Sequence, residues 1–241
     1  MSVSVVHGGR FGNHVFQYAC ARLFAEKNGL ELKDCLDGEG ILTTTFHTKG
    51  RSVDLPVVTF EDGQNDILDK EFPPACYVFR GYFQKAKWYH DRKKDVLRFF
   101  LQTRLPAPAD PKDIVIHLRL DDYLRDGLSI HPEWYLKVLE MEKFDRLHIV
   151  AEEYHEKYFS YFKKFDPVIH VKDKISDWYY VQGFDRIVCA NGTFSWWAAF
   201  LSRASRIYTH KRWVKAFPHA DLSFFPNGVQ VDGPFVDEKS L

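Results

Sequence analysis

The chain has 241 residues, of which 45% are hydrophobic and 27% are charged, and this balance excludes intrinsic disorder and collagen-like structure. Its 33 Lys and Arg residues equal its 33 Asp and Glu residues in number, so no overall charge favours binding to nucleic acid or to an anionic membrane. A chain of this size can bury one large hydrophobic core or two smaller ones.

The first residues, Met-Ser-Val-Ser-Val-Val, lack the basic region and the apolar stretch of a signal peptide, and no later segment approaches the length of a membrane span. We therefore expect a cytoplasmic protein without a transmembrane segment. The four cysteines lack the spacing of a zinc site or a disulfide framework, so we expect reduced thiols. They are Cys20, Cys35, Cys76 and Cys189.

The N-terminal part of the chain begins with a predicted strand at residues 3–7, followed by the glycine-rich loop G-G-R-F-G. A helix predicted over residues 13–28 has one apolar stripe, and Gly29 is a typical residue to end it. Residues 30–69 are rich in Gly, Thr and Asp and predict no regular element. A strand at residues 77–80 and a helix at residues 87–100 are predicted to follow.

A proline-rich segment, L-P-A-P-A-D-P-K, separates two parts of the chain. Its residues Pro106, Pro108 and Pro111 interrupt both helices and sheets. We interpret the segment as a linker between an N-terminal domain, residues 1–105, and a C-terminal domain, residues 112–241. Two such halves predict a cleft between them.

Beyond the linker, β-rich runs alternate with helical patterns, which is typical of a parallel sheet covered by helices. The strands are predicted over residues 114–117, 147–150, 168–171, 187–189 and 207–209, and the helices over residues 132–144, 154–165, 177–183 and 194–202. The predicted fold class is therefore α/β, with a doubly wound parallel sheet. Ligands of such sheets bind beyond the carboxyl ends of strands, which selects the segments after His117, Ala151, Lys172 and Ala190.

Polar residues crowd the end of the first of these strands, in V-I-H-L-R-L-D-D-Y. The two-residue period of a strand puts His117 and Arg119 on one face, and Asp121 and Asp122 follow directly. Arg119 could bind an anionic ligand there, or it could form a structural salt bridge with an aspartate. Its position at the carboxyl edge of a predicted central strand favours ligand binding.

The segment N-G-T-F-S-W-W follows another predicted buried strand and opens an apolar helix. Asn191, Thr193 and Ser195 could cap this helix, or they could leave its amides free for a pyrophosphate. The Trp196-Trp197 pair lies inside the helical run, which favours core packing over stacking on a sugar.

The N-terminal glycine loop also stands between a strand and a helix, although it lacks the G-x-G-x-x-G spacing of a dinucleotide-binding loop. Arg10 and Asn13 could meet an anion at the start of the helix. Alternatively, they could be a surface charge and an ordinary N-cap residue.

Four segments between Gly8 and Leu201 together resemble the α-1,2-fucosyltransferase family, in the same order along the chain. G-G-R-F-G-N-H-V-F-Q-Y-A resembles the family's N-terminal G-N-Q segment, and G-Y-F-Q resembles its G-Y-F-Q segment. H-L-R-L-D-D-Y resembles the H-x-R-R-x-D-Y motif, and N-G-T-F-S-W-W-A-A-F-L resembles the N-S-T/S-F-S-W-W-A-A-W-L segment. A more distant similarity links the chain to protein O-fucosyltransferases, which keep only the first arginine.

The resemblance implies a GT-B-like fold, in which two Rossmann-like halves face each other across a cleft and the C-terminal half binds the nucleotide. It also implies an inverting enzyme that transfers L-fucose from GDP-fucose to a hydroxyl of a glycan acceptor. Neither a metal nor another cofactor is expected, and the partners are the nucleotide sugar and the glycan.

The expected site residues follow from the resemblance together with their positions. The catalytic set is Arg119, Asp122 and Asn13, and the donor-binding set is Arg10, Gly12, His117, Arg119, Asp177, Thr193, Phe194 and Ser195. Arg119 and the amides near residues 193–195 would hold the leaving diphosphate. Asp122 is the first candidate base and Glu152 the second, and Asp122 could instead orient Arg119. Asp177, in a segment that resembles the family's D-F-x-x-M, would read the guanine edge.

The sequence departs from the family pattern at several of these positions. Leu120 replaces the second arginine, Asp121 replaces a glycine, Gly192 replaces a serine, and Ala-Glu-Glu at residues 151–153 stands where Ser-Asp-Asp is common. Two alternatives therefore stay open: the same scaffold with another donor, such as activated L-rhamnose, and a non-catalytic module that binds a sugar nucleotide. The acceptor and the oligomeric state are also open.

Overall fold

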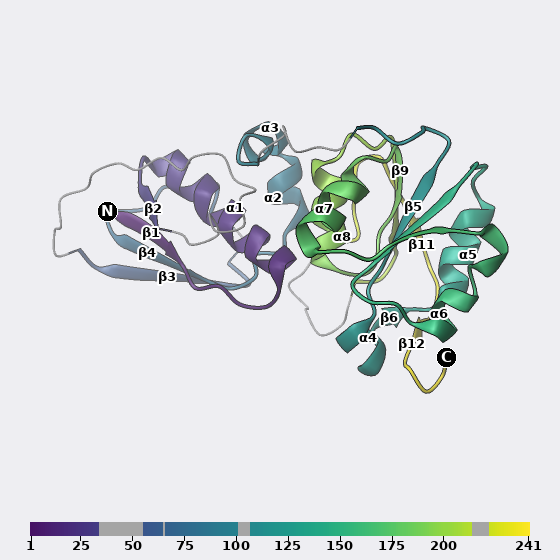
Figure 1. The fold of residues 1–241 in the computed structure, drawn as a ribbon. Helices are drawn as coiled ribbons and strands as arrows, with labels where there is room; N and C mark the ends of the chain where they lie inside the picture. The colour runs from purple at the N-terminus through teal and green to yellow at the C-terminus, as the bar shows by residue number, and fades with distance from the viewer. Residues whose placement is uncertain (34–54, 65, 101–106, 214–221) are drawn as a thin grey trace. The chain divides into compact units, whose positions relative to one another are not determined.

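The computed structural model describes residues 1–33, 55–64, 66–100, 107–213 and 222–241. The chain divides into two compact units, Met1–Thr103 and Arg104–Leu241. Each unit contains a parallel sheet with helices, as shown in Figure 1. The cysteine Cys35 lies outside the described residues, and the three described cysteines are free thiols.

The first unit has a four-stranded sheet in the order β2-β1-β4-β3, and all of its strand pairs are parallel. The strands are β1 (Ser2–Val5), β2 (Glu31–Lys33), β3 (Val57–Glu61) and β4 (Cys76–Arg80). The prediction of no regular element between residues 30 and 69 was therefore wrong. Both missed strands are short, and few of their residues are buried, so they carry little of the periodic signal that marks a strand.

The long helix α1 (Phe11–Asn28) starts two residues earlier than predicted. Arg10 is its N-cap residue, so the alternative that Asn13 caps the helix was wrong. Gly29 ends the helix in the left-handed conformation with φ 61°, as predicted from its lack of a side chain. Nearly all of α1 from Phe11 to Ala25 is buried.

Two short helices, α2 (Ala86–His90) and α3 (Lys93–Leu97), replace the single predicted helix over residues 87–100. The break falls at Arg92, whose backbone has left the helical conformation with φ −119° and ψ 26°. The Arg92 guanidinium donates to the carbonyl of Trp88 and to the carboxylate of Asp69. The bond to Asp69 links the break to a segment more than twenty residues upstream. The local sequence pattern does not reveal such a contact.

The second unit has a six-stranded sheet in the order β11-β10-β9-β5-β7-β8, and every pair in it is parallel. The strands are β5 (Ile114–Leu118), β7 (Leu147–Ala151), β8 (Val168–His170), β9 (Arg186–Val188), β10 (Arg206–His210) and β11 (Gly228–Val231). Numbered along the chain, this is the 3-2-1-4-5-6 strand order of the Rossmann fold. The doubly wound parallel sheet predicted for this half is confirmed.

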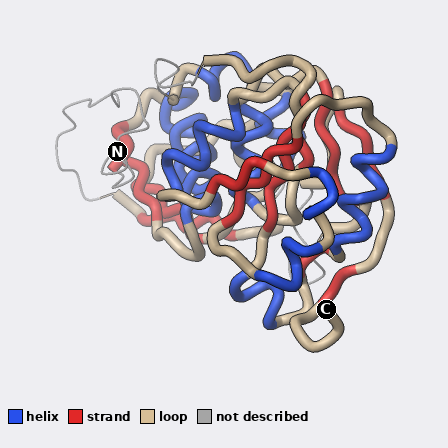
Figure 2. Tube along the Cα trace, turned by 45° about the vertical axis from the view of Figure 1, so that its right-hand side comes forward, coloured by secondary structure: helices blue, strands red, loops and turns tan. Residues whose placement is uncertain are grey.

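Helices cover both faces of this sheet (Figures 1 and 2). The helices α5 (Pro132–Glu140) and α6 (Glu156–Ser160) lie on one face, and α7 (Lys174–Gln182) and α8 (Thr193–Leu201) lie on the other. The predicted helix over residues 154–165 is split into α6 and a short 3-10 helix, Lys163–Phe165. The predicted helix over residues 132–144 ends early, at Glu140.

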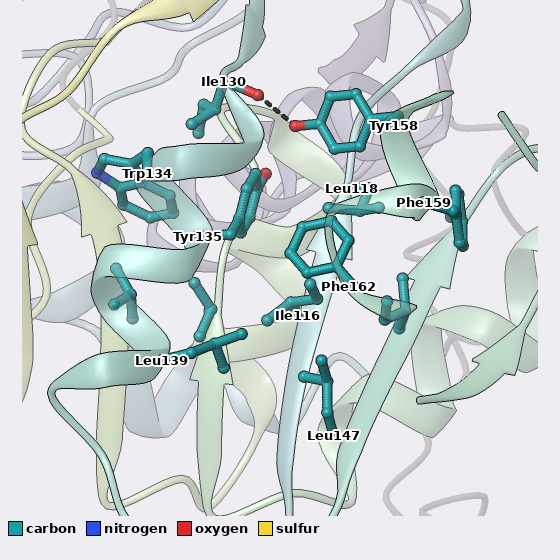
Figure 3. Close-up of a cluster of buried hydrophobic side chains, with 14 of the residues drawn as sticks. Ile116, Leu118, Ile130, Trp134, Tyr135, Leu139, Leu147, Tyr158, Phe159 and Phe162 are labelled. Carbon is teal, nitrogen blue, oxygen red and sulfur yellow. Dashed lines mark hydrogen bonds between the residues drawn. The ribbon is translucent and has the colours of Figure 1, made fainter. Parts of the chain in front are cut away.

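The hydrophobic core between the sheet and α5 and α6 is shown in Figure 3. Alternate residues of β5 and β7 point into it, as the two-residue period of a strand requires. Trp134 and Tyr135 of α5 and Tyr158 of α6 are its largest side chains, and each of their polar atoms has a backbone partner. The Tyr158 hydroxyl donates to the carbonyl of Ile130 (Figure 3).

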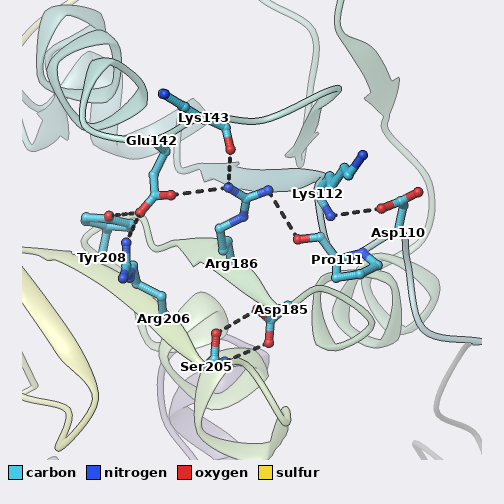
Figure 4. Close-up of polar contacts among 10 residues, drawn as sticks. All are labelled: Asp110, Pro111, Lys112, Glu142, Lys143, Asp185, Arg186, Ser205, Arg206 and Tyr208. Carbon is cyan, nitrogen blue, oxygen red and sulfur yellow. Dashed lines mark hydrogen bonds and ion pairs between the residues drawn. The ribbon is translucent and has the colours of Figure 1, made fainter.

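A polar network closes the amino end of the same sheet (Figure 4). The Glu142 carboxylate accepts hydrogen bonds from Arg186, Arg206 and Tyr208, which belong to β9 and β10. Burial raises the pKa of this carboxyl, but the three donors together lower it below its usual value. One carboxylate thus joins the loop after α5 to two strands.

The strand β11 was not predicted, and neither were three elements near the carboxyl end of the sheet. They are α4 (Asp121–Arg125), β6 (Ser129–Ile130) and β12 (Phe235–Val236). β6 and β12 pair in the antiparallel sense, which brings the chain after β11 back to the segment after α4.

Candidate functional site

The strand order of the second sheet reverses beside β5. From β5 the chain passes to β7 and β8 on one side, and it then returns to β9 on the other side of β5. In open parallel sheets, ligands bind at such a reversal, beyond the carboxyl ends of the strands. Arg119 follows β5, Glu152 follows β7, and Gly192 follows β9 after a short connection. These residues therefore gather at the predicted binding edge.

Arg119 is the centre of this group, and only 14% of its side chain is exposed. One guanidinium nitrogen contacts the Asp122 carboxylate at 2.5 Å, and the other contacts the Glu152 carboxylate. The ring of Tyr123 lies under the guanidinium, 4.7 Å from it. The salt bridge between Arg119 and an aspartate, considered above as the alternative to ligand binding, is thus present. Glu152 is a second partner of Arg119, and this pairing was not predicted.

The residues after Arg119 are held by the loop that follows β7. The amide of Leu120 donates to Glu152 at 3.2 Å, and the amide of Asp121 donates to Glu153 at 3.1 Å. Asp121 has a φ of 41°, an unusual value for a residue with a side chain, and it marks local backbone strain. Leu120, which stands where the α-1,2-fucosyltransferase motif has its second arginine, is fully buried in the core. At this position the chain therefore has a core residue in place of a polar one.

Burial raises the pKa of the Glu152 carboxyl above its usual value, although the neighbouring Arg119 guanidinium acts in the opposite direction. Glu152 therefore takes up a proton more readily than an exposed glutamate. Protonation would weaken its ion pair with Arg119.

His117 is the last polar residue of β5 and is buried. Its ring stacks on Phe194 of α8, with ring centroids 4.8 Å apart. Its Nδ1 atom has no hydrogen-bond partner among the described residues. Burial lowers the pKa of His117 from 6.5 to about 3, and the positive charge of Arg119 acts in the same direction. The imidazole is therefore neutral at physiological pH.

This neutral histidine predicts a pH-dependent stability. The unfolded chain binds a proton at His117 below about pH 6.5, whereas the folded chain does not until about pH 3, so stability falls as the pH is lowered through this window. The loss approaches about 1.4 kcal/mol per pH unit. His117→Gln should remove this component, which urea unfolding of both proteins at about pH 5 and about pH 7 would measure. An equal pH dependence in the two proteins would contradict the prediction.

The start of α8 carries no side-chain cap, because its N-cap residue is Gly192. The Ser195 hydroxyl donates to the carbonyls of Ala190 and Gly192, so it stabilises the turn into the helix. A Cβ atom at Gly192 would lie 3.8 Å from Cδ of Arg119, which shows that the arginine passes directly over this helix end. The positive end of the helix dipole and the guanidinium therefore lie together.

Asn191 lies beside this helix end and is 2% exposed. Neither its amide oxygen nor its amide nitrogen has a hydrogen-bond partner among the described residues. Buried amides are normally paired, so this side chain has capacity to bind a further polar group. The sequence analysis singled out Asn191 only for its place at the start of the helix, as a possible cap.

Asp177 lies on α7, beyond the carboxyl end of β8. Its carboxylate contacts His170 at 2.6 Å and accepts the Lys172 amide at 3.2 Å. The His170 ring stacks on Tyr180 with ring centroids 3.9 Å apart. That Asp177 reads a base stays a prediction, and a base would compete with His170 and with the Lys172 amide for this carboxylate.

Of the remaining predicted residues, Thr193 is the first residue of α8, and the others belong to the first unit. Arg10 and Gly12 stand at the start of α1, and the Asn13 side chain accepts a hydrogen bond from Gln84 at 2.9 Å. Gln17, which the sequence did not single out, holds the glycine loop through bonds with His7, Gly8 and Gly81. The roles of Arg10, Gly12 and Asn13 stay predictions.

Two observations on the described residues concern metal binding and membrane insertion. Among them, no group of three or more His, Cys, Asp or Glu residues is arranged to hold a metal ion. No helix in the described part of the chain has the length and the hydropathy that a membrane span requires.

The sequence matches no protein-family model and no curated protein. The solved structures that resemble the chain in fold include the following two. One is a mutant of the Arabidopsis thaliana fucosyltransferase FUT1 in complex with GDP, with 11% identity and a TM-score of 0.50 over 85% of this chain and 69% of that chain. The other is the E. coli heptosyltransferase WaaC with ADP, with 12% identity and a TM-score of 0.50 over 97% of this chain and 94% of that chain.

The chain has a GT-B-like fold. Within this GT-B-like fold, the Rossmann-like second unit carries the strand-order reversal at which Arg119 and Gly192 lie close together.

Proposed function

We propose that the chain is an inverting glycosyltransferase that transfers L-fucose from GDP-fucose to a hydroxyl of a glycan. The observation that carries the proposal is the position of Arg119, which lies over the uncapped start of α8 at the strand-order reversal of a Rossmann-like sheet. Such a helix start binds phosphate groups, and an arginine beside it adds charge and directed donors. The sequence resemblance to α-1,2-fucosyltransferases supports the choice of donor.

The main chemical task is to stabilise the nucleoside diphosphate as it leaves the sugar. Arg119 and the first amides of α8 would supply hydrogen bonds to its developing negative charge. Because Arg119 already contacts two carboxylates, we expect a bound diphosphate to replace at least one of them. Glu152 is the one we expect to be released, since burial makes its charged form less favourable and raises its pKa.

The acceptor hydroxyl must lose a proton as it attacks the opposite face of the sugar. We propose Asp122 as the base, with Glu152 as the alternative. Arg10 and Asn13 of the first unit would contact the transferred sugar.

A second candidate function keeps the scaffold but changes the donor. The fold similarity to a heptosyltransferase structure with ADP extends over more of the chain than the similarity to the fucosyltransferase. Leu120 in place of the second arginine also separates this chain from the fucosyltransferase pattern. Other nucleotide sugars, such as activated L-rhamnose, and a non-catalytic sugar-nucleotide-binding module are therefore the alternatives to test.

A panel of ligands in a thermal-shift assay would distinguish these donors. A ligand that binds only the folded state stabilises it by about 2.7 kcal/mol when its concentration is 100 times the Kd. We expect GDP-fucose and GDP to raise the unfolding temperature, with smaller shifts from ADP, UDP and dTDP. A larger shift from another nucleotide would overturn the donor assignment, and nucleotide binding without sugar transfer in product analysis would favour the non-catalytic module.

A further inference from the structure

The chain after β11 runs beside residues 124–131, which follow Arg119 in the sequence. We call residues 232–238 the strap. It begins near Gly233, continues through β12 and ends at Glu238, whose amide donates to the carbonyl of Leu124 at 3.0 Å. Leu124 belongs to α4, the helix that also carries Asp122. The strap therefore reaches the loop of the candidate site from outside it.

The start of the strap is fixed by three side chains. The carbonyl of Gly233 contacts Nε2 of His210 at 2.9 Å and accepts a hydrogen bond from Arg212 at 2.6 Å. A Cβ atom at position 233 would lie 2.5 Å from Cδ1 of Trp134, so only glycine passes this close to the ring. Trp134 is itself fixed in the core, because its Nε1 donates to the carbonyl of Val231. The strap thus starts from a rigid point.

The middle of the strap forms a small sheet with the segment after α4. Phe235 pairs with Ile130 and Val236 pairs with Ser129, in the antiparallel sense. The amide of His131 extends the pairing by donating to the carbonyl of Pro234 at 3.0 Å. Backbone bonds of this kind fix the paired segment in register.

One side chain connects this small sheet to Arg119. The Ser129 hydroxyl, which is buried, donates to the Arg119 carbonyl at 2.7 Å. Asp121, two residues further along, holds a strained backbone conformation. Strained residues persist only where surrounding structure fixes them, and the strap bonds to the middle of residues 119–130 at Leu124 and to their carboxyl end at Ser129 and Ile130.

We propose that the strap is a positioning element, which holds residues 119–130 so that the Arg119 guanidinium and the Asp122 carboxylate face the donor. This proposal rests on the proposed function of Arg119. It adds a second part of the chain, more than a hundred residues away, on which the geometry of that site depends. Displacements of about 1 Å at a reacting centre can cost 10²-fold in rate, so a loosened strap should be visible in turnover.

The test uses proline to remove one strap hydrogen bond at an exposed position. Glu238→Pro deletes the amide that donates to Leu124. The matched control is Ser240→Pro, which deletes an amide beyond the strap; among the described residues this amide donates to Asp237 within one turn and not to residues 119–130. We expect Glu238→Pro to lower kcat by roughly tenfold, with an unchanged unfolding temperature. Hydrogen exchange should become roughly two- to tenfold faster at residues 120–130 in this variant. The control should match the wild type in all three measurements.

The possible outcomes distinguish a failure of the strap proposal from a failure of the proposed function. If Glu238→Pro leaves both kcat and exchange unchanged while Arg119→Ala abolishes turnover, the strap proposal is wrong and the function stands. If the wild type transfers no sugar, the proposed function fails, and exchange at residues 120–130 decides alone whether the strap holds the loop. Ser129→Ala, which removes the bond to the Arg119 carbonyl without altering the strap, should lower kcat as well, and an unchanged kcat would overturn the connection to Arg119.

Discussion

Replacing Arg119 by alanine is expected to reduce sugar transfer by about 10²–10³-fold, the usual effect of removing one donor to the charge that develops in a transition state. The structure gives this residue no strong packing role, since its neighbours are two partly exposed carboxylates, the Tyr123 ring and the edge of Gly192. Folding should therefore persist. Transfer is measured as GDP release and as fucosylated product, and folding as the unfolding temperature.

Arg125→Ala is the matched control for this experiment, because Arg125 lies on the nearby α4 but is exposed, and among the described residues its ion-pair partner is Asp126. Its transfer rate should equal that of the wild type. Arg119→Lys should recover only part of the rate, since an ammonium group lacks the planar pair of donors that a guanidinium offers to phosphate. Near-normal transfer by Arg119→Ala would exclude Arg119 from the leaving-group site.

Replacing Trp197 by alanine is expected to lower the free energy of unfolding by about 3–5 kcal/mol, the usual cost of truncating a large buried aromatic residue. Trp197 is fully buried in α8, and its ring meets those of Trp196 and Phe200 edge to face. Urea unfolding would measure the loss. Trp197→Phe should recover most of it, because an aromatic ring still fills much of the space.

The same experiment decides between two interpretations of the tryptophan pair in the sequence. A tryptophan that stacks on a sugar would be exposed, and its removal would weaken ligand binding with little effect on stability. The burial of both rings favours packing, as the sequence analysis predicted. An alanine variant that unfolds at the wild-type urea concentration but loses ligand binding would contradict this.

The parts of the fold that could be predicted are those in which local sequence carries the signal. β5 and β7 are buried on both faces, so their sequences are nearly continuous apolar runs. α8 was visible from its apolar run after a glycine, and α1 from its stripe and from Gly29. Once strands and helices alternate, the carboxyl edge and its polar residues follow from general rules of parallel sheets.

Other features depend on contacts between distant residues, and a single sequence does not contain that information. Glu152 and Arg119 are 33 positions apart, and only the pairing of β5 with β7 brings them together. The break at Arg92 depends on a partner in a loop. The short strand β12 has only two residues and forms because β6 lies beside it, so no periodic pattern marks it.

The Glu142 network lies at the end of the sheet opposite to Arg119, because Arg186 and Arg206 begin their strands whereas Arg119 follows the end of its own. A strand of five residues separates the two ends by roughly 16 Å. Mutations that improve or weaken the network should therefore change the thermal tolerance of the protein without changing its choice of substrate. This separation gives evolution, and protein engineering, two regions of the second unit that can be varied independently.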